Sequence, residues 1–137
     1  MAHRNRPGTE RRPVVLFAPH DPRSVERARD ASLSELEKLL AGLGFQPVDR
    51  MVQRRRPDAR TLLGAGQLEE LRAIVEEARR RAGGELHLAV DAHLTPGQLH
   101  FLERALELPV LDRVAVVLRV FEQRARTPTA WLEIELA

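Results

Sequence analysis

The apolar residues of this chain occur in short runs that are separated by amphipathic stretches. Such runs indicate buried strands, and we predict four of them, at residues 14–18, 45–53, 86–90 and 108–112. Pro47 has no N–H to donate to a ladder. The start of the second strand should therefore lie at a sheet edge or outside the ladder.

Between the first three runs, apolar residues recur at helical spacing. The first helical pattern begins at Ser24 and is stopped by Gly44. The second follows Gly66 and is closed by Gly83 and Gly84. These patterns predict two helices, each of which connects one strand to the next.

Two further helices are predicted later in the chain. Thr95 can cap the third, with Pro96 in the first turn and Gln98 completing a capping box. Residues 113–125 are rich in β-branched side chains, which favours a strand. Their length, a possible cap at Asp112 and an i, i+3, i+4, i+7 stripe favour a helix instead. The stripe consists of Val114, Val117, Leu118 and Phe121.

Strands that alternate with helices predict an α/β fold. We expect a small doubly wound, mainly parallel four-stranded sheet with helices on both faces. Residues 1–12 are predicted to be a flexible basic tail, and residues 13–112 the α/β domain.

Composition restricts the class of protein further. The 137 residues are 43% hydrophobic and 31% charged, which suits one globular domain. There is no Cys, so disulfides and thiol chemistry are excluded. No apolar run approaches the roughly 18 residues of a membrane span, and none suits a signal peptide. We therefore expect a cytoplasmic protein with no membrane partner.

A glycine pair, Gly64 and Gly66, resembles the start of a phosphate-binding loop. A dinucleotide fingerprint needs a small residue where Glu69 stands, and a P-loop needs a Lys in the loop. The only Lys of this chain is Lys38, inside a predicted helix. The pair therefore either shapes a turn or leaves a helix N-terminus open to an anion.

The sequence also contains candidate metal ligands and catalytic carboxylates, but their spacing does not support either role. His87, Asp91, His93 and His100 lack metal-ligand spacing, so we predict no metal site. Asp91 and Asp112 end strands, at the sheet edge where ligands bind in open α/β folds. Each also has an ordinary capping role, and no activated partner is visible. We predict no catalytic residue.

A basic loop precedes the glycine pair, and its predicted RNA-binding residues are Arg54, Arg55, Arg56, Arg60, Gly64 and Gly66. Clustered guanidiniums beside a helix N-terminus suit a phosphate backbone. The alternative is a solvated loop, because no aromatic side chain lies nearby to stack on a base.

Three segments in the same order resemble the HflX-type GTPases. They read "QRRRPDARTLLGAGQLEEL", "LTPGQLHFLERAL" and "LDRVAVVLRVFEQRARTPTAWLEIELA". The stretch from Gln123 to Thr127 matches the family outright. Together the segments lie within residues 14–137.

The resemblance implies an N-terminal domain of ribosome-associated GTPases, which bind the large subunit and split or rescue stalled ribosomes. In that family a helical hairpin and the GTPase domain follow. Residues 113–137 are therefore expected to be C-terminal helices that begin a helical arm, although "WLEIELA" alternates like a strand. GTP and Mg²⁺ are expected only on the GTPase domain, so this chain should be no enzyme.

The sequence also departs from the family. The family's G-K-G-K is Gly64-Ala65-Gly66-Gln67 here, so both lysines are missing. Gln67 completes the expected RNA-binding set through this motif. Arg119 stands where the family has Asp. The resemblance therefore implies an RNA contact that is weakened or shifted onto the arginines.

Three functions remain open. The first is a non-catalytic domain that binds large-subunit ribosomal RNA. The second is a regulatory or protein-interaction module that binds a partner helix or a GTPase domain, in cis or in trans. Its expected interaction helix presents Phe121, Gln123, Arg124 and Arg126. The third is a small-ligand-binding α/β domain that uses the strand ends.

Overall fold

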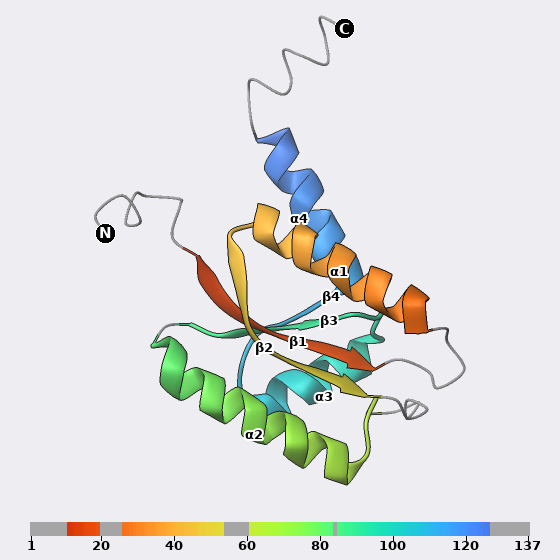
Figure 1. Ribbon diagram of the computed structural model, residues 1–137, viewed down its shortest axis with the longest axis vertical. Coiled ribbons are helices and arrows are strands. Elements are labelled where there is room, and N and C mark those ends of the chain that lie inside the picture. Colours follow the sequence, from red (N-terminus) through yellow and green to blue (C-terminus); the bar gives the residue numbers. More distant parts are fainter. Residues whose placement is uncertain (1–10, 20–25, 54–60, 84, 127–137) are drawn as a thin grey trace, which may run out of the picture.

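The computed structural model describes residues 11–19, 26–53, 61–83 and 85–126 (Figure 1). The predicted alternation of strands and helices is confirmed. In chain order the elements are β1 (Arg12–Pro19), α1 (Glu26–Gly42), β2 (Phe45–Gln53), α2 (Ala65–Ala82), β3 (His87–Val90), α3 (Pro96–Leu106), β4 (Val110–Asp112) and α4 (Arg113–Ala125).

The four strands form one parallel sheet in the order β2-β1-β3-β4. Helices α1 and α4 cover one face, and α2 and α3 cover the other (Figure 1). The chain crosses from one side of β1 to the other after β2, as in a doubly wound fold. The predicted fold class is therefore confirmed.

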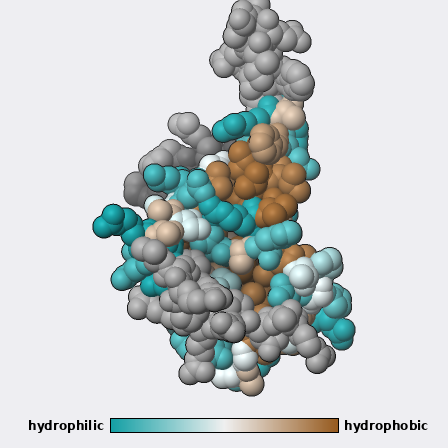
Figure 2. Space-filling model, turned by 90° about the vertical axis from the view of Figure 1, so that its right-hand side faces the viewer, coloured by the Kyte–Doolittle hydropathy of each residue, from teal (hydrophilic) through white to brown (hydrophobic). Residues whose placement is uncertain are grey.

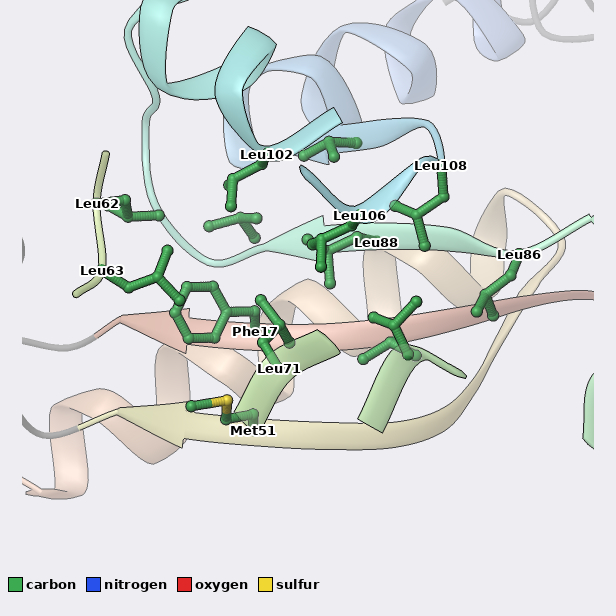
Figure 3. Close-up of a cluster of buried hydrophobic side chains, with 14 of the residues drawn as sticks. Phe17, Met51, Leu62, Leu63, Leu71, Leu86, Leu88, Leu102, Leu106 and Leu108 are labelled. Atoms are coloured by element: carbon green, nitrogen blue, oxygen red, sulfur yellow. The ribbon is translucent and has the colours of Figure 1, made fainter. Parts of the chain in front are cut away.

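Strand β1 is a central strand with both faces covered, which explains its continuous apolar run. Val15 and Phe17 point into the cluster under α2 and α3, which Figure 3 shows in close-up. Val14, Leu16 and Ala18 point into the opposite cluster, under α1 and α4. Successive side chains of a strand alternate between faces, so a central strand with both faces covered needs apolar residues at every position.

Strand β2 lies at the edge of the sheet, in agreement with the position of Pro47. Its register with β1 shifts between Val14 and Val15, which pair with Pro47 and Asp49 respectively. Val48 is the extra residue of this bulge. Bulges and prolines are both tolerated at edges because they interrupt a ladder on one side only.

Some predicted boundaries differ from the structure. Arg12, which we assigned to the flexible tail, lies in β1, where its N–H donates to the Gly44 carbonyl oxygen. Strand β3 begins at His87, one residue later than predicted. Strand β4 begins at Val110 rather than 108, and Glu107 ends α3 in a left-handed conformation with φ of 54°.

The ambiguous stretch after Asp112 is a helix, as its spacing predicted. Its apolar stripe, however, does not face the sheet. Val116 is the buried residue of α4, whereas Leu118 is 57% exposed and Phe121 is 62% exposed. An amphipathic helix normally buries its apolar face. Helix α4 therefore presents an apolar surface that the rest of the described chain leaves uncovered.

Candidate nucleic-acid interface

The glycine pair lies at the N-terminus of α2, on the side of the sheet where the strands end (Figure 1). Gly64 is the N-cap residue, and no side chain caps the helix. Gly64, Ala65 and Gly66 are all exposed. The first N–H groups of a helix carry a partial positive charge, so this uncapped end is suited to an anion.

Neither glycine is required by the backbone conformation. Gly64 is extended, with φ of −76° and ψ of 175°, and Gly66 is helical. A Cβ at Gly66 would meet nothing within 4 Å. Glycine in a helix is less stable than alanine by about 0.5–1 kcal/mol. The absence of a side chain at Gly66 therefore leaves the helix end accessible at some expense of stability.

The unusual backbone conformation in this segment belongs to Leu62, with φ of 78°. Leu62 and Leu63 are buried and point into the cluster that contains Phe17 and Leu71 (Figure 3). A left-handed leucine costs about 1–2 kcal/mol, and burying a leucine side chain contributes about 1.5–3 kcal/mol. Burial of both leucines holds the turn in place and leaves the following glycines outside.

The predicted RNA-binding arginines Arg54, Arg55, Arg56 and Arg60 lie outside the described residues. Gly64, Gly66 and Gln67 lie within them, at the start of α2. The Oε1 atom of Gln67 would lie 2.9 Å from a Cβ at Gly64, so this amide folds back over the N-cap.

The arginines on the body of α2 are paired with carboxylates. Arg72 pairs with Glu69, Arg79 with Glu76, Arg80 with Glu77, and Arg81 with Glu77 and Asp49. Arg79 also donates to the carbonyl oxygens of Leu106 and Glu107. Paired charges on an exposed helix attract a phosphate backbone weakly, so this face of α2 is a poor candidate interface.

Both candidate catalytic carboxylates at the strand ends have structural partners. Asp91 Oδ1 accepts from Ser32 Oγ at 3.1 Å and lies 2.8 Å from Arg113 Nη1. Asp112 Oδ1 accepts from the Ala115 N–H and its Oδ2 from the Leu94 N–H. These bonds join α1, β3, β4 and α4, which gives both aspartates a role in the fold.

His87 is buried at the start of β3, edge-on to the Phe45 ring at 5.0 Å between centroids. Burial lowers the pKa of His87 below its ordinary value of 6.5. The charges of Arg12 and Arg119 lower it further, against a rise from Glu85. Within the described residues, no group of three His, Cys, Asp or Glu side chains could hold a metal ion.

The expected interaction residues Phe121, Gln123, Arg124 and Arg126 are all exposed on α4 or at its C-terminal end. The sequence pattern did not indicate that the apolar stripe of α4 lies on the surface beside these residues. Figure 2 shows this apolar area, which consists of Val114, Val117, Leu118 and Phe121. We call these four residues the α4 stripe.

The architecture defines a small α/β domain built on a four-stranded parallel sheet. Comparison with known proteins assigns this domain to a family. The profile of the family described as GTP-binding GTPase N-terminal matches residues 30–122. This range is more than half of the chain, which therefore belongs to that family.

Relatives of the chain are named GTPase HflX. That of Lacrimispora saccharolytica is 36% identical over 113 residues, which cover 82% of this chain and 26% of the relative. That of Akkermansia muciniphila is 31% identical over 135 residues, which cover 98% of this chain and 30% of the relative. The chain thus spans about a quarter to a third of the length of these relatives. The activity of a whole GTPase is therefore not assigned to it by the match.

A solved structure shares the fold. A crystal structure of an SsGBP mutation variant superposes with a TM-score of 0.50 at 19% identity, over 91% of this chain and 36% of that chain. No helix in the described part of the chain is both long and apolar enough to span a bilayer.

Proposed function

We infer that this chain is the non-catalytic, RNA-binding N-terminal domain of an HflX-like GTPase and that it docks on large-subunit ribosomal RNA. The observation that carries this proposal is the exposed, uncapped N-terminus of α2 directly after an arginine-rich segment. Helix N–H groups and guanidiniums together form a phosphate-binding combination. GTP and Mg²⁺ belong to the GTPase domain, and the site of action is the cytoplasm, where ribosomes work.

The test is binding to purified large ribosomal subunits across a series of salt concentrations. Replacing Arg54, Arg55 and Arg56 by Ala together should weaken binding and flatten its salt dependence. Each phosphate group that is no longer bound lowers the slope of log K against log salt by about 0.7–0.9. The matched control replaces Arg50, Arg80 and Arg81 by Ala, which removes the same charge from guanidiniums already paired with carboxylates.

The proposal fails if the loop variant binds like the unchanged chain, or if binding is insensitive to salt. A control variant that loses as much affinity as the loop variant would also count against it. In that case net charge alone, rather than the arginine loop, would account for the binding.

The α4 stripe favours a second candidate function, a docking surface for a partner helix or a GTPase domain, in cis or in trans. An exposed apolar stripe along one helix is the geometry by which amphipathic helices associate. Ending the chain at about residue 126 removes the last stretch and keeps the stripe. Substituting Leu118 and Phe121 by Gln removes most of the stripe and keeps the length. Docking through the stripe predicts loss of partner capture only in the second variant.

A further inference from the structure

An open cleft lies at the other end of the strands from the α2 N-terminus. It joins the start of β1, the end of α1 and the last turns of α4, and its volume is about 670 Å³. Within the described chain it is lined by Arg12, Leu43, Arg119, Glu122, Gln123 and Arg126. We call this the arginine cleft, because three guanidiniums face one carboxylate.

Arg12 lies at the wall of the cleft, where two contacts orient its guanidinium. Its Cζ lies 4.0 Å from the centroid of the Phe45 ring, and its Nη2 donates to the Leu43 carbonyl oxygen at 3.2 Å. Phe45 is itself fully buried. The guanidinium is therefore stacked and bonded on one side, and among the described residues no other group accepts from its remaining N–H donors. A preordered donor loses little conformational entropy on binding.

Among the described lining residues of the arginine cleft, the positive charges outnumber the negative one. Within the described residues, Arg12, Arg119 and Arg126 form no ion pair, whereas each arginine on the body of α2 does. The field of two of them extends into the core, because Arg12 and Arg119 both lower the pKa of buried His87. A cluster of guanidiniums with a net positive charge attracts anions over several ångströms.

The chemistry of the lining selects among anions. Guanidinium forks match the paired oxygens of a phosphate, and Arg keeps its charge at any physiological pH. Among the described residues that line the cleft, Leu43 alone is apolar, so an acyl chain or a base would find little apolar surface. The cleft is also open rather than enclosed, which allows a strand to pass through it.

We propose that the arginine cleft binds the phosphate backbone of an RNA strand without reading its bases. The proposal rests on the proposed function in one respect, that the partner is RNA. It adds a second contact region, at the opposite end of the sheet from the α2 N-terminus.

The test uses the whole 137-residue chain, a labelled polyuridine of about ten nucleotides and purified large ribosomal subunits. The main variant is Arg119→Gln with Arg126→Gln, which leaves the Arg12–Phe45 stack in place. The conservative variant replaces the same two residues by Lys. The matched control, Arg80→Gln with Arg81→Gln, removes two paired charges from α2. Unchanged circular dichroism and thermal unfolding establish that each variant is folded.

The expected result is weaker polyuridine binding by the main variant, with a salt slope lower by about 0.7 for each phosphate group that it no longer binds. The Lys variant should keep most of the slope, and the control should bind like the unchanged chain. The proposal is overturned if the main variant and the control behave alike. It is also overturned if GMP or inorganic phosphate alone binds the unchanged chain as tightly as polyuridine and loses this binding in the main variant.

Failure of this proposal is distinguishable from failure of the proposed function. If only the Arg54, Arg55 and Arg56 variant loses binding to large subunits, the proposed function stands and the arginine cleft is excluded. If only the cleft variant loses binding, the cleft is the RNA contact and the loop is not. If neither loses binding, both proposals are wrong.

Discussion

Arg113 and Asp91 form an ion pair that joins the first residue of α4 to the end of β3. Arg113 Nη1 lies 2.8 Å from Asp91 Oδ1, and the Asp91 side chain is 1% exposed. The same guanidinium also pairs with Glu35 of α1 and donates to the Ser32 carbonyl oxygen. One side chain thus connects three elements on one face of the sheet.

Substitution of Arg113 by Met should therefore destabilise the fold. It leaves a buried carboxylate without its guanidinium, which should lower the free energy of unfolding by about 2–3 kcal/mol. Urea denaturation measures this difference. Arg80→Met is the control, because it breaks an exposed pair and should cost no more than about 0.5 kcal/mol. Equal effects of the two substitutions would contradict the prediction.

Substitution of Asp112 should destabilise the fold almost as much as substitution of Arg113. Its two carboxylate oxygens cap α4 through the Ala115 N–H at 2.8 Å and hold the Leu94 N–H at 3.0 Å. Asp112→Ala removes both bonds and should lower the free energy of unfolding by about 2 kcal/mol. Asp112→Asn keeps one acceptor oxygen and should lie between Ala and the unchanged chain. Equal losses for Asn and Ala would show that only the charge matters.

His87 should make stability depend on pH. Its folded pKa lies below its ordinary value of 6.5, mainly because burial disfavours the charged ring. Arg12 and Arg119 act in the same direction, and Glu85 acts against them. Below about pH 6.5 the unfolded chain then binds more protons than the folded chain, so stability from this group is present above that pH and is lost as the pH falls.

The limiting slope of this loss is about 1.4 kcal/mol per pH unit. Urea titrations between about pH 5 and 8 should show a flatter profile for His87→Phe than for the unchanged chain. His100→Gln removes an exposed imidazole, keeps His87 and should retain the slope. Parallel profiles for the unchanged chain and His87→Phe would refute the assignment.

Gly66→Ala should change stability and RNA binding in opposite directions. The added methyl group meets no protein atom within 4 Å and improves helix propensity, so stability should rise by about 0.5–1 kcal/mol. The same methyl stands beside the exposed N–H groups and should weaken binding to large ribosomal subunits. Gly42→Ala at the end of α1 also meets nothing within 4 Å and serves as the control. Unchanged affinity for Gly66→Ala would remove this helix end from the interface.

Substitutions on the two sides of α4 should differ sharply in stability. Leu118→Gln with Phe121→Gln alters exposed side chains and should change the free energy of unfolding by less than about 0.5 kcal/mol. Val116→Ala empties a fully buried site and should cost about 1–3 kcal/mol. Thermal and urea unfolding measure both. A large loss in the double variant would mean that the α4 stripe is covered in solution.

Local signals in the sequence predicted most of the fold. The Thr95 capping box, the left-handed Gly83 at the end of α2 and the Asp112 cap all appear in the structure where the sequence placed them. Each depends on residues within three or four positions of the helix end. Such contacts are encoded locally, which is why a single sequence suffices for them.

The rest depends on contacts between residues that are distant in the sequence. Arg113 and Asp91 are 22 residues apart, and Arg12 meets the cleft residues of α4 only in the folded chain. Helical spacing predicted α4 but not the direction in which its stripe points. That direction is set by the burial of Val116. The same stretch contains several other valines, so the sequence alone does not indicate which of them is buried.

Helix α4 begins at Arg113, directly after the last residue of β4, with no connecting loop. Asp112 closes the strand and caps the helix, and Arg113 fastens the first turn to α1 and β3. The base of the helix is thus fixed by hydrogen bonds and ion pairs, which couples the orientation of α4 to that of the sheet.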